Sequence, residues 1–286
     1  MKAHLLLFVC LLSSLSCTTR VGPRIGTPVQ PVRVAGFTLR EDVIYTPPGW
    51  PQALPADVYV PDGPGPWPGI LLIHGGSWAN KDRRSDMDGI AGHLARRGYV
   101  VMNATYRLAP QHIHPAQIHD LQQATRWLRT HADQLHLQPD HLGVFGYSAG
   151  GHLAALLAAL DAPADLRFQA VVAGGAPSDL RKFDRSPIVT TYLGGSLQEK
   201  SALYAAASPV THLTSDDPPV FIYHGTRDTL VPPDHASDYA AALKKVGIPH
   251  ELVWQNGRGH IAAFLSYGDI LTPALSFLDR HLRQPK

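Results

Sequence analysis

The sequence predicts an α/β fold in which helices cover both faces of one mostly parallel sheet. Short apolar segments alternate along the chain with longer stretches of helical periodicity, the pattern of strands joined by right-handed helical crossovers. A chain of 286 residues with 44% hydrophobic and 17% charged residues is also long and apolar enough to bury one sizeable core. We therefore expect a single folded domain over residues 37–286.

Eight segments have the pattern of strands. Residues 37–45 and 54–60 alternate apolar with polar side chains around a Pro-Pro-Gly turn, as in an antiparallel hairpin. Short apolar runs typical of buried parallel strands follow at 69–73, 99–103, 142–145, 170–173, 220–223 and 251–254. Between them, segments such as 153–160 carry apolar residues at the spacing of one helical face.

Residues 1–16 have the features of an export signal. Lys2 is followed by a short apolar run at 5–12, which is too short to span a bilayer, and then by small residues. Cys17 follows in a context similar to the lipobox of bacterial lipoproteins, which implies cleavage before Cys17 and a lipid on its thiol. The alternative is an ordinary cleaved signal that leaves a free thiol. Residues 17–36 are rich in Pro, Gly and Val without periodicity, and we interpret them as a flexible tether outside the fold.

These features predict the location and exclude some partners. We expect an exported protein of the bacterial cell envelope that contacts the membrane through Cys17. Thr18 in place of an Asp favours an outer-membrane lipoprotein, and a periplasmic or secreted protein is the alternative. Lys and Arg number 25 against 23 Asp and Glu, without a basic run, so no nucleic-acid partner is expected. The other cysteine, Cys10, lies in the signal segment, so we expect no internal disulfide.

The strongest local signal is a GxSxG pattern at residues 146–150. It lies between the strand at 142–145 and an apolar helix, the context in which a serine nucleophile is presented on a sharp turn. Gly146 and Gly150 lack the side chains that would collide in such a turn. We therefore predict that Ser148 is a nucleophile.

A serine hydroxyl needs an imidazole to take its proton and a carboxylate to orient that imidazole. His260 follows a glycine-rich loop between the last strand and the last helix, and we predict it as the base. Asp228 lies on the loop after the strand at 220–223, at the same sheet edge, and we predict it as the acid. Asp234 and Asp179 are the alternatives, although Asp234 stands after two prolines and before a helix, as an N-cap would.

The loop after the strand at 69–73 is predicted to bind the negatively charged oxygen of the reaction intermediate. Its residues Gly75, Gly76 and Ser77, together with the amide of Ala149, would form an oxyanion hole. Which of the three loop amides donates stays open. His74 stands at the strand end, where we expect it to brace the loop by hydrogen bonding.

Two bulky rings stand next to these groups. Trp78 follows the oxyanion loop and Tyr147 precedes the nucleophile, so we expect both to shorten the substrate pocket, although either ring could simply pack in the core. A long acyl chain would need a lid or cap. The only long connection, 175–219, contains one short predicted helix at 198–207. The sequence therefore predicts short acyl groups, from acetyl to about butyryl.

The motifs together resemble the esterase branch of the α/β hydrolases. This branch includes hormone-sensitive-lipase-like carboxylesterases, acetyl-xylan and feruloyl-type esterases, and arylformamidases. The resemblance covers residue 68 to the C-terminus and rests on HGGSW at 74–78, YRLAP at 106–110, GYSAGG at 146–151, SPV at 208–210, HGTRD at 224–228 and NGRGH at 256–260. It implies an α/β-hydrolase fold with a mostly parallel eight-stranded sheet, to which the antiparallel start also points. It also implies a cofactor-independent serine carboxylic-ester hydrolase that forms an acyl-enzyme with acetyl or aryl esters, some of them carbohydrate-linked.

Four other interpretations are weaker. An arylformamidase-like amide hydrolase fits HGGxW but not the export signal, and a peptidase of the prolyl-oligopeptidase type would need a propeller or large cap. A non-catalytic lipid-anchored binding protein would be expected to lack part of the catalytic set. A metal site at His112, His114, His119 and Asp120 is less consistent with the pattern than a loop followed by an amphipathic helix, so no metal is expected.

Overall fold

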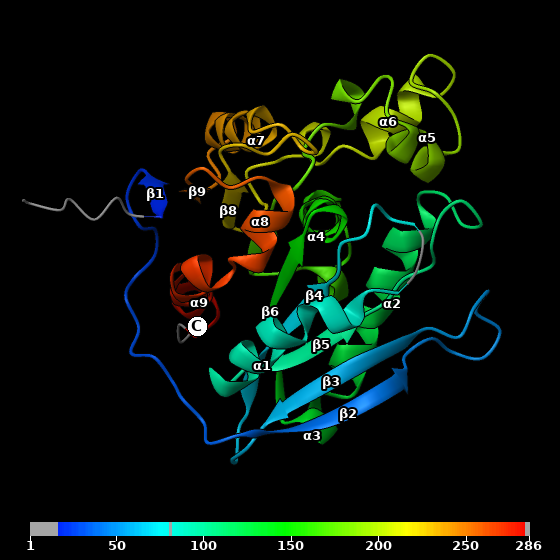
Figure 1. Cartoon of the computed structure of the whole chain (residues 1–286). Coiled ribbons are helices and arrows are strands. Elements are labelled where there is room, and N and C mark those ends of the chain that lie inside the picture. Colours follow the sequence, from blue (N-terminus) through cyan, green and yellow to red (C-terminus); the bar gives the residue numbers. More distant parts are fainter. Residues whose placement is uncertain (1–16, 80–81, 284–286) are drawn as a thin grey trace, which may run out of the picture.

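The computed structural model describes residues 17–79 and 82–283. Its centre is a nine-stranded sheet with the order β1-β9-β8-β7-β6-β4-β5-β3-β2 (Figure 1). The strands are β1 (Thr18–Val21), β2 (Phe37–Ile44), β3 (Pro55–Pro61), β4 (Trp67–Ile73), β5 (Val100–Ala104), β6 (Leu137–Tyr147), β7 (Ala170–Gly174), β8 (Val220–Gly225) and β9 (His250–Gln255).

The sheet is parallel in its middle and antiparallel at both edges. Neighbouring strands from β5 through β4, β6, β7 and β8 to β9 run parallel. The β2–β3 hairpin is antiparallel, as the alternating pattern predicts, and β3 also pairs antiparallel with β5. All eight predicted strands are present. Seven have ends within two residues of the prediction, whereas β6 begins five residues before the predicted 142–145.

The ninth strand is a correction to the predicted eight. Thr18–Val21 forms β1, which pairs antiparallel with β9, so the interpretation of residues 17–36 as a tether outside the fold is wrong for this segment. The Arg20 side chain forms an ion pair with Glu251 on β9, and the same buried carboxylate accepts a hydrogen bond of 2.8 Å from the amide of Ile25. A buried acid requires such partners, and they hold the N-terminal segment on the sheet.

Helices cover both faces of the sheet. Ile70 and Leu72 of β4 belong to one core with α1 and α9, whereas Leu71 and Ile73 belong to the other core with α2, α4 and α7. Of the described helices, none is long and apolar enough to cross a membrane. The helices are α1 (Asp88–Arg96), α2 (Ala116–Thr130), α3 (Ala132–Leu135), α4 (Ala149–Ala159), α5 (Pro187–Leu193), α6 (Ser201–Ala206), α7 (Asp234–Lys245), α8 (His260–Leu265) and α9 (Gly268–Leu282).

The loops that follow the parallel strands meet at the carboxyl edge of the sheet. Ser148 follows β6, Asp228 follows β8 and His260 follows β9, so all three emerge at this edge. The long connection 175–219 carries α5 and α6, which stand beyond the same edge (Figure 1). α6 lies within the helix predicted at 198–207. Catalytic and binding groups of parallel α/β sheets are found at such an edge.

Candidate active site

A sharp turn between β6 and α4 presents Ser148. Its backbone has φ 56° and ψ −124°, a positive-φ conformation that is unfavourable for a residue with a side chain. A hydrogen bond of 2.8 Å from its amide to the carbonyl of Gly174 helps to hold this conformation. The flanking glycines are required by space: a Cβ on Gly146 would lie 2.1 Å from the Gly150 oxygen, and one on Gly150 would lie 2.1 Å from the Ile73 oxygen.

The structure brings Ser148, His260 and Asp228 into one hydrogen-bonded chain. His260 Nε2 lies 2.8 Å from Ser148 Oγ, and His260 Nδ1 lies 2.6 Å from Asp228 Oδ2. Asp228 is 2% exposed and His260 is 7% exposed, so water has little access to the bond between them. This arrangement allows the imidazole to take a proton from the serine while the carboxylate stabilises the imidazolium.

The surroundings of Asp228 keep it ionised. Burial raises the pKa of this carboxyl, but hydrogen bonds from His224, His260 and the amide of Val231 outweigh the burial and hold the pKa well below its usual range. The amides of Leu230 and Val231 donate to Oδ1 at 3.0 and 2.9 Å. The acid can therefore stabilise a positive charge on the base across the neutral pH range.

The two alternative acids are engaged elsewhere. Asp234 Oδ2 accepts a hydrogen bond of 2.8 Å from Lys182 Nζ, and Asp179 accepts hydrogen bonds of 2.8 Å from the Arg181 side chain. Asp234 is the first residue of α7 rather than its N-cap, which is Pro233, so the N-cap interpretation is wrong by one residue. The prolines before it set the helix start.

The predicted oxyanion loop passes directly against the nucleophile. A Cβ on Gly75 would lie 3.3 Å from Ser148 Cβ, which shows how closely the loop backbone approaches. Gly76 has φ +109° and Ser77 has φ 59°. With two successive positive φ values the chain turns sharply after β4 instead of continuing as an extended segment. Gly75, Gly76 and Ser77 line one cavity beside Ser148, and Ala149 lines a second. Their role as oxyanion donors stays a prediction.

His74 braces this loop, as expected from its position. Its Nδ1 donates to the Gly75 oxygen at 2.7 Å, and its ring stacks on Tyr106 with 4.6 Å between centroids. The Tyr106 hydroxyl donates to the His74 carbonyl at 3.0 Å. Burial lowers the pKa of His74, which keeps the ring neutral. Because the ring is completely buried and its Nδ1 is held by the Gly75 carbonyl, we interpret His74 as a structural group.

Two cavities adjoin Ser148. The smaller one has a volume of about 40 Å³ and is walled by apolar side chains that include Trp78 and Val189. The larger one, of about 360 Å³, is lined by His260, Tyr147 and the exposed side of α8. Both predicted pocket rings therefore line a cavity at the nucleophile, although each is almost fully buried.

The sequence reasoning missed a histidine that fixes the wall of the small cavity. His152 Nδ1 accepts a hydrogen bond of 3.1 Å from the Trp78 indole, and its Nε2 donates to the Ala207 oxygen at 2.7 Å. Burial lowers the pKa of His152 to about 3, so it stays neutral and can accept from Trp78. The only signal was a histidine on an otherwise Ala- and Leu-rich helix.

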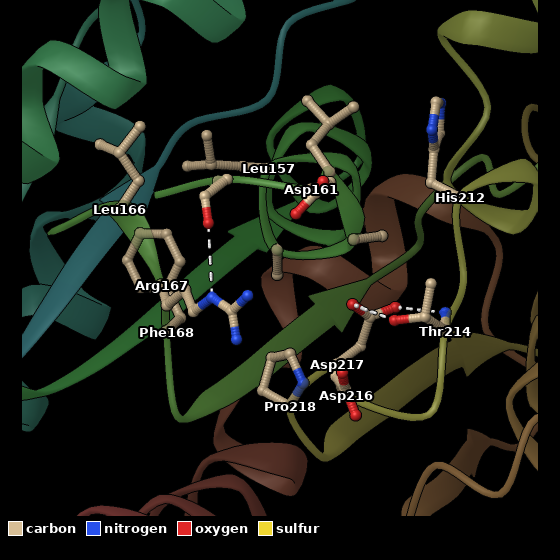
Figure 2. Close-up of a pocket in the computed structure, with 14 residues that line it drawn as sticks. Leu157, Asp161, Leu166, Arg167, Phe168, His212, Thr214, Asp216, Asp217 and Pro218 are labelled. Carbon is tan, nitrogen blue, oxygen red and sulfur yellow. Dashed lines mark hydrogen bonds between the residues drawn. The ribbon is translucent and has the colours of Figure 1, made fainter. Parts of the chain in front are cut away.

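Other polar clusters lie apart from this site. A cavity of about 310 Å³ at the amino edge of the sheet is lined by the end of α4 and by Arg167, Asp216 and Asp217, without any triad residue (Figure 2). Among the described residues, no group of three or more His, Cys, Asp or Glu side chains could hold a metal ion. Asp120 is buried against the Arg107 guanidinium at 2.8 Å and His114 bonds to a tyrosine hydroxyl at 3.0 Å.

Fold and site together define an α/β hydrolase. The BD-FAE family model matches residues 56–243, most of the folded chain, and the chain belongs to this family. The predicted fold class and the predicted relation to α/β-hydrolase esterases are therefore confirmed.

Relatives and solved structures agree with this assignment. The chain is 31% identical to a probable carboxylic ester hydrolase, LipM of Mycobacterium tuberculosis, over 63% of this chain and 45% of the relative. The chain spans about half the length of LipM and of two further esterases of the same organism, LipC and LipQ. A truncated carbohydrate esterase from gut microbiota has the same fold, with a TM-score of 0.78, 22% identity and coverage of 91% and 100% of the two chains. A butyrate-bound esterase of Thermogutta terrifontis is 28% identical, with a TM-score of 0.70 and coverage of 85% and 94%.

Proposed function

We propose that this protein is a serine carboxylic-ester hydrolase that acts on short-chain acyl esters through an acyl-enzyme. The observation that carries the proposal is the hydrogen-bonded chain of Asp228, His260 and Ser148 at a strained turn beside a glycine-rich loop. The names of the relatives, which are carboxylic ester hydrolases and esterases, support the same activity.

The geometry accommodates the whole reaction. Ser148 Oγ attacks the ester carbonyl carbon while His260 Nε2 takes the hydroxyl proton, and the carbonyl oxygen becomes negatively charged opposite the amides of the oxyanion loop and Ala149. His260 then returns the proton to the alcohol oxygen, and the bond from that oxygen to the carbonyl carbon breaks. Water repeats the sequence on the acyl-enzyme: His260 takes its proton, and the acid leaves as Ser148 regains its hydrogen.

The positions of the two cavities support an assignment of the two halves of the ester. Because His260 protonates the leaving alcohol, the alcohol must occupy the larger cavity, which His260 lines. The acyl group then enters the smaller cavity of about 40 Å³. This volume corresponds to roughly three water-sized groups. It therefore suits a chain with one to about three carbons beyond the carbonyl, which is the range from acetyl to butyryl.

A series of nitrophenyl esters tests the acyl assignment. We expect kcat/KM to be highest between acetate and butyrate and to fall steeply at octanoate and dodecanoate. The Ser148→Ala variant should show no turnover above the background reaction. Acetylated xylan and a feruloylated sugar, included in the same series, test the carbohydrate-linked substrates to which the resemblance points. A preference for dodecanoate would refute the pocket assignment.

We further propose that the protein is a lipoprotein of the bacterial envelope, anchored through Cys17. The lipobox-like context supports this proposal, and the thiol is exposed. Cys17→Ala should move the enzyme from the membrane fraction to the soluble fraction without changing its activity on a soluble ester. Wild-type protein that is soluble and begins beyond Cys17 would contradict the anchor.

A further inference from the structure

The proposed anchor lies at the same edge of the sheet as the catalytic residues. β1 runs antiparallel to β9 with Thr18 opposite Gln255, and the Asn256 amide donates a hydrogen bond of 2.9 Å to the Cys17 carbonyl. Asn256 begins the loop that leads to His260 at the start of α8. Cys17 is therefore fixed to the loop that carries the catalytic base, at the carboxyl edge. Figure 1 shows β1 beside β9.

This attachment leaves little freedom between the anchor and the folded domain. Cys17 directly precedes β1, and one residue spans at most about 3.5 Å of extended chain. A second hydrogen bond, of 2.9 Å from the Asn256 side chain to Thr19 Oγ1, holds the start of β1 in place. A lipid on Cys17 would therefore keep the carboxyl edge at the membrane surface, whereas a flexible tether would have allowed any orientation.

The side chains that would meet such a surface are apolar. Ile261 and Leu265 stand one helical turn apart on α8 and are 63% and 72% exposed, and Leu230, 45% exposed, lies on the same large cavity. Seven large hydrophobic side chains are exposed in the described structure, and four of them line the two cavities at Ser148. Apolar side chains gathered in this way mark a contact surface rather than random exposure.

Two arginines lie on the loops that carry Asp228 and His260, next in sequence to this apolar group. Arg227 is exposed on the loop after β8, and its amide donates a hydrogen bond of 2.9 Å to the carbonyl of Arg258 on the loop after β9. The Arg258 guanidinium lies 3.9 Å from Asp269, a long and partly exposed ion pair. Apolar groups flanked by arginines are complementary to a lipid surface with anionic headgroups.

We infer that the anchored enzyme lies with its catalytic edge against the phospholipid bilayer, so that the Ile261–Leu265 side of α8 touches lipid and the leaving-group cavity opens toward the membrane surface. This inference rests on the proposed lipid anchor. It implies that an ester whose alcohol part lies in or at the membrane reaches the leaving-group cavity directly from that surface.

Site-directed fluorescence on the full lipidated protein tests the orientation. The protein is placed in proteoliposomes of zwitterionic and anionic phospholipid. Because the Cys17 thiol carries the lipid, the new thiol of the Leu265→Cys variant can be labelled selectively with an environment-sensitive fluorophore. We expect a blue-shifted emission that lipids with a nitroxide near the headgroup quench. Ile261→Cys serves as a second position. Leu39→Cys is the matched control: Leu39 is 40% exposed on β2, the strand at the other end of the sheet order from β1 and β9. A fluorophore at this position should show neither a blue-shifted emission nor quenching.

The possible outcomes distinguish a wrong orientation from a wrong lipid anchor and from a wrong esterase activity. Two outcomes in protein that floats with the vesicles would overturn the orientation alone. One is equal quenching at positions 265 and 39, and the other is no quenching at either position 265 or position 261. Protein that does not float with the vesicles would overturn both the anchor and the orientation. Hydrolysis of a soluble nitrophenyl butyrate by the same proteoliposomes, with Ser148→Ala as the blank, reports the esterase activity independently.

Discussion

Asp228 determines the electrostatics of the site at the scale of single residues. Its Oδ2 binds His260 Nδ1 at 2.6 Å and lies 3.4 Å from His224 Nε2, so two imidazoles face one carboxylate. His224 is completely buried and donates from the same nitrogen to the Val231 oxygen at 2.8 Å. It thus ties the acid-bearing loop to β8 and favours the ionised form of Asp228.

Replacing Asp228 by Asn should lower kcat by about 10³–10⁴-fold, because an amide in this position would donate to His260 Nδ1 and favour the wrong tautomer. Steady-state kinetics on a nitrophenyl butyrate substrate measure the effect, and circular dichroism checks the fold. Asp234→Asn is the matched control, since Asp234 pairs with Lys182 on the surface, and it should retain near wild-type kcat. The assignment of the acid would have to be abandoned if the two variants exchanged these results.

The catalytic residues could be predicted from the sequence because each has a local signal. Ser148 is marked by its flanking glycines and His260 by a loop between the last strand and helix. The role of His152 could not be predicted, since its partners Trp78 and Ala207 lie 74 and 55 positions away in the sequence. Contacts of this kind follow from the packing of the chain rather than from any motif.

At the scale of elements, the turn between β6 and α4 depends on close backbone packing. Gly150→Ala would place a methyl group 2.1 Å from the Ile73 oxygen, a backbone atom that can move only if β4 moves. We expect a loss of roughly 3 kcal/mol in the free energy of unfolding, together with loss of activity. Gly268→Ala at the start of α9 meets nothing within 4 Å and should change stability by less than about 1 kcal/mol. Urea unfolding of both variants measures the difference, and equal stabilities would contradict the packing argument.

The strands differ in how well the sequence predicts them. The parallel strands were predictable because their apolar runs reflect burial on both faces. β1 was not, because its four residues have no apolar run and its place depends on Glu251, more than two hundred residues away in the chain. A short polar edge strand of this kind cannot be distinguished from a linker until its partner is known.

At the scale of the whole molecule, buried neutral histidines link stability to pH. Burial lowers the pKa of His114 and of His235 to about 4 and that of His152 to about 3. The unfolded chain, with a histidine pKa near 6.5, binds protons below that pH that the folded protein does not. Stability should therefore be constant above about pH 6.5 and fall toward pH 4, by up to about 1.4 kcal/mol per pH unit for each histidine.

Urea midpoints between pH 7.5 and 4.5 measure this dependence. His152→Gln should flatten the decrease at acidic pH, whatever its stability at neutral pH. His136→Asn is the matched control, because His136 is exposed and its left-handed backbone accepts Asn. Its slope should equal that of the wild type. An unchanged slope in His152→Gln would show that this buried imidazole is not a source of the acid sensitivity.

The most direct test of the account is to map the site that an organophosphorus ester modifies. Such a reagent reacts with a serine only where a base activates the hydroxyl. Mass spectrometry of peptides from protein treated with diethyl nitrophenyl phosphate should show one adduct, on Ser148, that accumulates in step with the loss of esterase activity and is nearly absent in His260→Ala. Complete loss of activity with Ser148 unmodified, or equally fast labelling in His260→Ala, would contradict the proposed nucleophile and its activation.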